Sequence, residues 1–308
     1  MRQTCMNMVY ELAKQDPRVV FIGSDLGVGT LKQFKAEMPD RYYMEGVSEQ
    51  NIVGMAAGFA LEGKVVYFNT IATFITRRCF EQVVIDLCLH NVPVRLIGSG
   101  GGMVYAPLGP THLAIEDIAI FRALPNMTIV APAEANEMRR FMVQSVNHPG
   151  PIYIRLGKGG DPIVTPDDQQ FVIGKTYSLR EGKDALIVTT GITAKTSLDA
   201  AAALAQQGIE AGVLHVPTVK PLDADAILKR VTSVPVVVTI EEHTLMGGLG
   251  SAVAELVAEA GFSPAKRFKR LGIPDVFPDQ YGSQASLMER YQLTANHLVQ
   301  TVTKLHRG

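Results

Sequence analysis

Short apolar runs rich in β-branched residues alternate with helical patterns along the whole chain, and this alternation constrains the fold more than any other feature. In the first half, strands are predicted at 19–24, 65–69, 92–99, 127–132 and 151–156, and helices at 3–15, 50–61, 78–90, 115–124 and 133–147. Strands that alternate with helices in this way form parallel sheets that carry helices on both faces.

A stretch rich in glycine, proline and aspartate, GKGGDPIVTPDDQQ at 157–170, interrupts the alternation and indicates a linker. After it, strands are predicted at 184–191, 210–216 and 234–242, and helices at 193–207, 223–231, 249–260 and about 294–305. The sequence therefore predicts two doubly wound α/β domains with mainly parallel sheets, one at residues 1–160 and one at 175–308.

The composition narrows the class of protein. The chain has 308 residues, of which 47% are hydrophobic and 19% charged, so it can bury a large core. Its net charge of −1 argues against nucleic acid or an anionic membrane as the main partner. Cys5, Cys79 and Cys88 lack the spacing of a metal site, and an odd number of cysteines fits free thiols in a reducing compartment. We therefore expect a cytoplasmic protein that binds neither nucleic acid nor membrane.

A carboxylate, Glu49, opens the apolar stretch MEGVSEQNIVGMAAGFALEG at 44–63. Ser48 is a plausible N-cap, and Glu49 then lies in the first turn of a helix, where the helix dipole favours negative charge. Small residues at 54–60 would let this helix lie close to another backbone. From these residues alone, Glu49 is either a simple partner of the dipole or a functional acid.

Three further stretches follow predicted strands, and open α/β sheets bind ligands at the ends of their strands. GSDLGVGT at 23–30 contains Asp25 but lacks the spacing of a phosphate-binding loop, so a plain turn explains it equally well. His112 follows the glycine-rich GSGGG at 98–102 and either serves a substrate or only caps a helix. Phe74 contacts a ligand or belongs to the core. No metal motif is present, and EEHTLMGGLG at 241–250 is interpreted as a turn.

Taken together, VSEQNIVGMAAGFAL, LGPTHLAIEDIAIFRALPNMTIVAPAEANE and EEHTLMGGLGSAVAEL resemble the second half of transketolase, in order and in spacing. The resemblance extends over nearly the whole chain and implies a pyrimidine-binding domain followed by the transketolase C-terminal domain. Deoxyxylulose-phosphate synthase and the β subunits of 2-oxoacid dehydrogenases share this framework, but the run from GPTH to FRALPN is most similar to transketolase.

The resemblance implies roles for the residues singled out above. In that family the corresponding glutamate contacts a ring nitrogen of the aminopyrimidine of thiamine diphosphate and shares a proton with it, which activates the cofactor. The resemblance therefore assigns Glu49 to cofactor activation, Phe74 to stacking on the pyrimidine and Asp25 to cofactor binding. It assigns His112 to the reacting hydroxyl groups of the substrate.

One motif of the family is missing from this chain. Transketolases bind Mg²⁺ and the diphosphate of the cofactor through a GDG motif and a later asparagine, and the sequence contains no GDG. The resemblance thus implies a split transketolase in which a partner subunit carries the metal and diphosphate ligands, and no metal site is expected here. A heterotetramer with a dimeric core is the expected assembly.

The departures from the family concern the substrate. Leu108 stands where relatives have an aspartate that contacts a sugar hydroxyl, and Gly100 stands where they have a histidine. Relatives also have a phosphate-contacting serine near the position of Gly29, and this chain lacks it. Candidates for substrate anions are Arg2, Arg78, Arg155 and Lys158, of which Arg155, at a strand end, has an equally plausible structural role. The usual pentose phosphates are therefore in doubt as substrates.

The expected function is the transfer of a two-carbon ketol unit from a ketose donor to an aldose acceptor. Two alternatives remain open at this point. In the first, the chain is a β-type subunit of another thiamine diphosphate enzyme, which either decarboxylates 2-oxoacids or is similar to deoxyxylulose-phosphate synthase. In the second, it is a scaffolding subunit that has kept the fold without activity.

Overall fold

The computed structural model describes residues 1–24 and 31–308. Asp25, to which the family resemblance assigned cofactor binding, and Gly29, near which it placed a lost phosphate contact, lie outside the described residues. No helix in the described ranges is long and apolar enough to cross a membrane. The cysteines Cys5, Cys79 and Cys88 are free and buried.

The first sheet has seven strands in the order β10-β5-β6-β4-β3-β1-β2. These strands are β1 (Val19–Gly23), β2 (Tyr42–Met44), β3 (Val65–Ile71), β4 (Val94–Ser99), β5 (Thr128–Val130), β6 (Ile152–Leu156) and β10 (Thr218–Lys220). All neighbours pair in parallel except β10, which runs antiparallel to β5. Because β10 comes from the second half of the chain, that half completes the sheet of the first.

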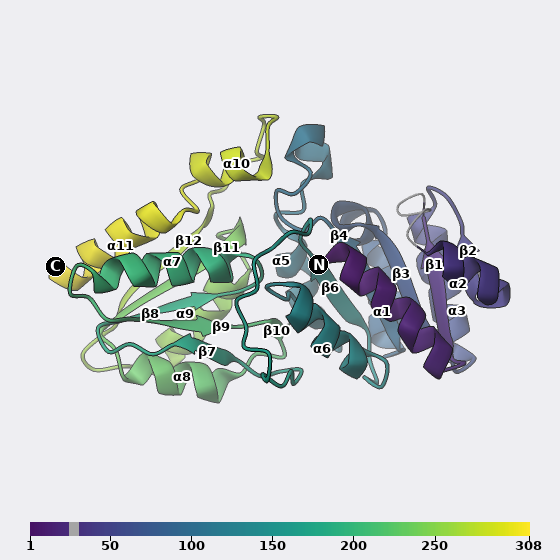
Figure 1. Cartoon of the computed structure of the whole chain (residues 1–308), viewed down its shortest axis with the longest axis horizontal. Coiled ribbons are helices and arrows are strands. Elements are labelled where there is room, and N and C mark those ends of the chain that lie inside the picture. Colours follow the sequence, from purple (N-terminus) through teal and green to yellow (C-terminus); the bar gives the residue numbers. More distant parts are fainter. Residues whose placement is uncertain (25–30) are drawn as a thin grey trace.

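Helices cover both faces of this sheet (Figure 1). The helices of the first half are α1 (Arg2–Gln15), α2 (Lys32–Glu37), α3 (Glu49–Leu61), α4 (Phe80–Gln82), α5 (Asp117–Arg122) and α6 (Ala135–Ser145), with short turns η1 (Pro39–Arg41), η4 (Ala106–Leu108) and η5 (Pro110–His112). Alternate residues of β1 face opposite ways, since Val19 and Phe21 pack with α1 and α6 whereas Val20 and Ile22 pack with α3.

The second sheet has five strands in the order β12-β11-β8-β9-β7. Its elements are β7 (Tyr177–Arg180), β8 (Ala185–Thr189), α7 (Thr193–Ala205), β9 (Ala211–His215), α8 (Ala224–Thr232), β11 (Val236–Thr244), α9 (Leu249–Glu259), β12 (Arg267–Ile273), α10 (Gln284–Arg290) and α11 (Ala295–Arg307). The edge strand β7 is antiparallel to β9, and the other pairs are parallel. Helices α7 and α11 cover one face, and α8 and α9 cover the other (Figure 1).

The predicted fold class is confirmed, with differences at particular elements. The helix predicted at 78–90 begins earlier and winds more widely, as η2 (Phe74–Arg78) and η3 (Val83–Leu89) are π-helical and flank α4. Residues 157–176, which include the stretch interpreted as a linker, form neither helix nor strand. Among the described α-helices and strands, six were not predicted from the sequence, namely α2, β2, β7, β10, β12 and α10.

Candidate active site

Glu49 is the first residue of α3, and its side chain is buried with only 1% of its surface exposed. One carboxylate oxygen, Oε1, accepts a hydrogen bond from the Thr70 hydroxyl at 3.1 Å. The other, Oε2, accepts one from Nη1 of Arg78 at 2.9 Å. Ser48 precedes the helix, but its hydroxyl donates to the carbonyl of Glu45 and caps no helical amide. The carboxylate is therefore held by two side-chain donors from β3 and η2.

The support for Glu49 continues to the end of β1. The Ser24 hydroxyl donates to Thr70 Oγ1 at 2.9 Å, and Thr70 in turn donates to Glu49. Ser24 and Thr70 lie at the carboxyl ends of the adjacent parallel strands β1 and β3, which is the edge where open α/β sheets place ligands. Sequence reasoning missed Thr70, since nothing in the run FNTIATF marks it as a partner of Glu49.

Phe74, Arg78 and His112 lie together next to Glu49. The guanidinium carbon of Arg78 is 4.1 Å from the centre of the Phe74 ring, which is the geometry of a cation–π contact. The His112 ring approaches Phe74 edge-on, with ring centres 5.3 Å apart. Glu49, Arg78, Phe74 and His112 thus form one continuous series of contacts, although they come from α3, η2 and η5.

The His112 ring is oriented through Nδ1, which lies 2.9 Å from the Thr111 hydroxyl. No other described residue forms a hydrogen bond with this ring. His112 is half-buried and ends the turn η5, so it does not cap a regular helix, and its second nitrogen, Nε2, is available to a ligand.

The glycines at 100–102 accommodate three side chains of the same protein. A Cβ at Gly100 would lie 2.1 Å from the Tyr105 ring, one at Gly101 2.5 Å from Arg155, and one at Gly102 2.4 Å from Glu242. Gly100 and Gly102 also have positive φ angles of +77° and +70°. Tyr105 therefore fills the space beside Gly100, the position where a histidine was expected from the family.

Arg155 does not present its guanidinium to a ligand. Only 8% of its side chain is exposed, and it donates to Asp117 at 2.7 Å and to the carbonyl of Glu242 at 2.8 Å. Burial alone would lower the pKa of Arg155, but Asp117 and Glu242 hold it above its ordinary value. For Asp117, the neighbouring Arg155 and His243 outweigh burial and lower the carboxyl pKa. These contacts favour a structural role for Arg155 over a role in substrate binding.

The EEHTLMGGLG stretch is more than a turn, because one of its acids caps a helix and two of its side chains contact the first half of the chain. Glu241 accepts hydrogen bonds from the amides of Leu249 and Gly250 and so caps α9. Glu242 accepts one from the Met103 amide at 2.7 Å. His243 accepts one from the Ala119 amide in α5.

The other predicted substrate residues lie outside the contact series. Arg2 opens α1 and is half-buried, and Lys158 is exposed on the linker. The two segments are neighbours, since the amino group of Met1 is 3.9 Å from Asp161. Leu108 is 48% exposed and is followed by Gly109, which packs against Tyr281.

Family models match both halves of the chain. The model described as "Transketolase, pyrimidine binding domain" matches residues 1–160, and that described as "Transketolase, C-terminal domain" matches residues 174–298. The chain belongs to the transketolase family.

Similar proteins include subunits of divided transketolases. The chain is 37% identical over 300 residues to the 6-deoxy-6-sulfo-D-fructose transketolase subunit SqwH of Clostridium sp. (strain MSTE9), covering 97% of this chain and 92% of that protein. It is 37% identical over 288 residues to one subunit of the apulose-4-phosphate transketolase of Actinobacillus succinogenes, covering 94% of this chain and 92% of that subunit.

A solved structure described as a split gene transketolase, inactive beta4 tetramer, is also similar. It superposes with a TM-score of 0.89 at 35% identity and covers 99% of this chain and 97% of that one. The prediction of a subunit of a split transketolase, a thiamine diphosphate family of transferases, is thereby confirmed. The roles of the individual site residues stay predictions.

Proposed function

We propose that this chain supplies the pyrimidine-binding half of the active site of a two-component transketolase, with Glu49 as the acid that contacts the aminopyrimidine of thiamine diphosphate. The observation that carries the proposal is the buried Glu49 carboxylate, which already accepts a hydrogen bond from a planar cation stacked on Phe74. An aminopyrimidine is also a planar nitrogen group that pairs with a carboxylate and stacks on a ring, so it fits the same two residues.

When bound, thiamine diphosphate supplies the nucleophile and electron sink for the transfer of a two-carbon ketol unit. The residues of this chain would position the cofactor and the substrate and would hold or transfer protons. Thr70 fixes Oε1 of Glu49. Oε2, which accepts a hydrogen bond from Arg78 in this structure, would share a proton with a ring nitrogen once Arg78 turns away. Phe74 orients the ring, and Nε2 of His112 contacts the reacting hydroxyl groups. Arg78, with 41% of its side chain exposed, is free to turn from Glu49 toward a substrate anion.

The test is Glu49→Gln in the enzyme reconstituted with its partner subunit. The substitution keeps the shape and removes the titrating carboxyl, so kcat should fall by roughly 10²–10⁴-fold, the contribution of a positioned proton-transfer group. Glu45→Gln is the matched control, since Glu45 is exposed just before the same helix. Melting temperatures of both variants should match the parent. A kcat near that of the parent for Glu49→Gln would refute the assignment.

The partner in this proposal is an N-terminal-half transketolase subunit that carries the GDG motif and the Mg²⁺ ligands. The assembly is a heterotetramer with a dimeric core, which analytical ultracentrifugation of the mixed subunits would detect. The proposed compartment is the reducing cytoplasm, with which the buried free thiols of Cys5, Cys79 and Cys88 are consistent.

The proposed donor is a ketose other than xylulose 5-phosphate. Leu108 cannot accept a hydrogen bond from a sugar hydroxyl, and Tyr105 fills the space beside Gly100. Two relatives are named for uncommon ketoses, 6-deoxy-6-sulfo-D-fructose and apulose 4-phosphate. Comparison of kcat/KM for these sugars and for xylulose 5-phosphate tests the proposal, and a preference for xylulose 5-phosphate would contradict it.

A further inference from the structure

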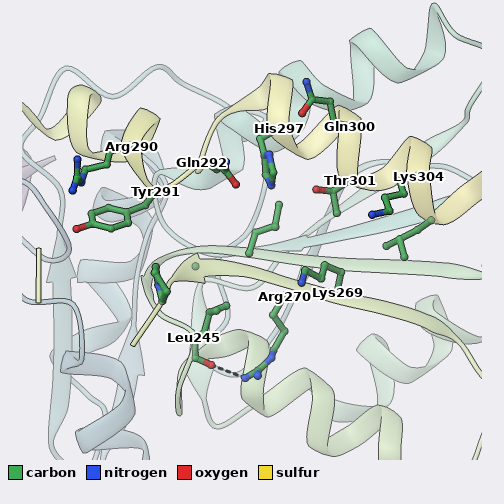
Figure 2. A pocket seen from close by; sticks show the side chains of 14 residues that line it. Leu245, Lys269, Arg270, Arg290, Tyr291, Gln292, His297, Gln300, Thr301 and Lys304 are labelled. Atoms are coloured by element: carbon green, nitrogen blue, oxygen red, sulfur yellow. Dashed lines mark hydrogen bonds between the residues drawn. The ribbon is translucent and has the colours of Figure 1, made fainter. Parts of the chain in front are cut away.

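The edge strand of the second sheet, β12, is rich in basic residues and borders a cavity. Its sequence is RFKRLGI, and α10 and α11 lie over it (Figure 2). Between the strand and these helices is a cavity of about 660 Å³. Volumes of 300–1,000 Å³ are typical of sites for small organic ligands.

The charged side chains that line this cavity are all basic. Lys269, Arg270, Arg290, His297 and Lys304 line it, and no aspartate or glutamate is among the lining residues that the structure describes. Arg270 is anchored, since it donates to the carbonyl of Leu245 and to the Ser251 hydroxyl. Lys269, Arg290 and Lys304 form no ion pair or side-chain hydrogen bond with the described residues, whereas Lys195 and Arg230 in the same domain are each paired with an acid.

The unpaired cations are spread along the cavity. In Figure 2, Arg290 and Tyr291 lie at one end, Lys269 and Lys304 at the other, and His297 extends from α11 toward the strand between them. A ligand that neutralises both ends must be elongated and carry more than one negative group. Phosphate groups meet this requirement, because arginine and lysine bind them through charge-assisted hydrogen bonds.

We propose that the cavity between β12 and α10–α11 binds a small organic polyphosphate, either a nucleoside polyphosphate or a sugar bisphosphate. The two sources share the chemistry of separated phosphate groups. None of the lining residues belongs to the contact series of Glu49, Arg78, Phe74 and His112. The proposal is therefore independent of the catalytic assignment, and it can be tested on this chain without the partner subunit.

The experiment is isothermal titration calorimetry of the full chain with ATP, fructose 1,6-bisphosphate and inorganic phosphate, at about 50 and about 200 mM NaCl. We expect ATP or fructose 1,6-bisphosphate to bind at least about tenfold more tightly than inorganic phosphate, and binding to weaken with salt. Lys269→Ala combined with Lys304→Ala should raise the dissociation constant at least about tenfold. Tyr291→Ala distinguishes the two sources, since loss of affinity for ATP alone indicates a nucleoside ligand.

The matched control is Lys229→Ala, on α8 at the opposite face of the sheet (Figure 1). It removes an exposed lysine and should leave the dissociation constant unchanged. The exposed positions of Lys269 and Lys304 make loss of folding unexpected, and a circular dichroism melt of each variant checks this. The proposal is overturned if neither organic probe binds more tightly than inorganic phosphate, or if the lysine double variant binds like Lys229→Ala.

Discussion

Replacement of Arg155 by methionine distinguishes its structural role from a role in substrate binding. The guanidinium donates to Asp117 Oδ2 at 2.7 Å, to Asp117 Oδ1 at 3.3 Å, and to the carbonyls of Glu242 and Ala114 at 2.8 and 3.2 Å. Methionine has a similar length and fills the space, but it leaves the buried Asp117 carboxylate without its cation. The Glu242 carboxyl, whose pKa burial already raises, loses the same nearby positive charge.

The expected loss of stability follows from this geometry. Removal of one partner of a buried ion pair costs about 3–5 kcal/mol, because the remaining charge stays buried and uncompensated. For a domain of this size each kcal/mol corresponds to roughly 2–4 °C in melting temperature, so Arg155→Met should lower it by roughly 6–20 °C. Arg155→Lys keeps the charge but not the planar fork of donors, and we expect an intermediate decrease.

The assay is thermal denaturation of the free chain, followed by steady-state kinetics of the reconstituted enzyme. Arg139→Met is the control, since Arg139 is exposed on α6 and its removal should change stability by about 0.5 kcal/mol or less. A melting temperature of Arg155→Met equal to that of Arg139→Met, together with a raised KM for a phosphorylated donor, would refute the structural role.

The free chain should bind thiamine diphosphate weakly and be inactive, because the proposed partner holds the diphosphate and metal; steady turnover by the pure chain would contradict this. Leu108→Asp should raise kcat/KM for xylulose 5-phosphate, because the aspartate would accept a hydrogen bond from a sugar hydroxyl whose lack of a partner costs roughly 1–3 kcal/mol. If the ratio of kcat/KM for xylulose 5-phosphate to kcat/KM for other ketoses does not change, the assignment of Leu108 is wrong. Burial, and secondarily Arg95, lowers the pKa of His148 from 6.5 to about 4. Between these pH values the unfolded chain binds one proton more than the folded chain, so the free energy of unfolding should decrease as the pH decreases through that window. His148→Gln should make this decrease smaller. Parallel curves of unfolding free energy against pH for parent and variant would show that His148 does not contribute.

Most of the sheet could be predicted because its strands are buried on both sides and leave continuous apolar runs in the sequence. The strand β12 was missed because its alternating residues are basic and partly exposed. The strand β10 was missed because it is three residues long, and its pairing with β5 joins positions far apart in the chain. The start of η2 at Phe74 was missed because wide turns change the period that marks a helix.

The candidate site was predictable as a set of residues but not as a set of contacts. Glu49, Phe74 and His112 were chosen through motifs, and the structure brings them together through Arg78. The glycine run at 100–102 allows a close approach of other side chains to the backbone, which was not predicted from the sequence. Only the fold identifies what approaches, since Tyr105, Arg155 and Glu242 reach these glycines from separate segments.

The strand β10 has a consequence for engineering chimeric enzymes. It lies beyond the linker in sequence yet completes the sheet before the linker, and one apolar core continues from Val20 and Phe68 to Leu186 and Val237 across both sheets. A hybrid joined at residues 157–176 would therefore place a foreign edge strand beside β5 and mismatch that core. When this chain is recombined with a relative, we therefore expect a working hybrid to need both domains from the same parent.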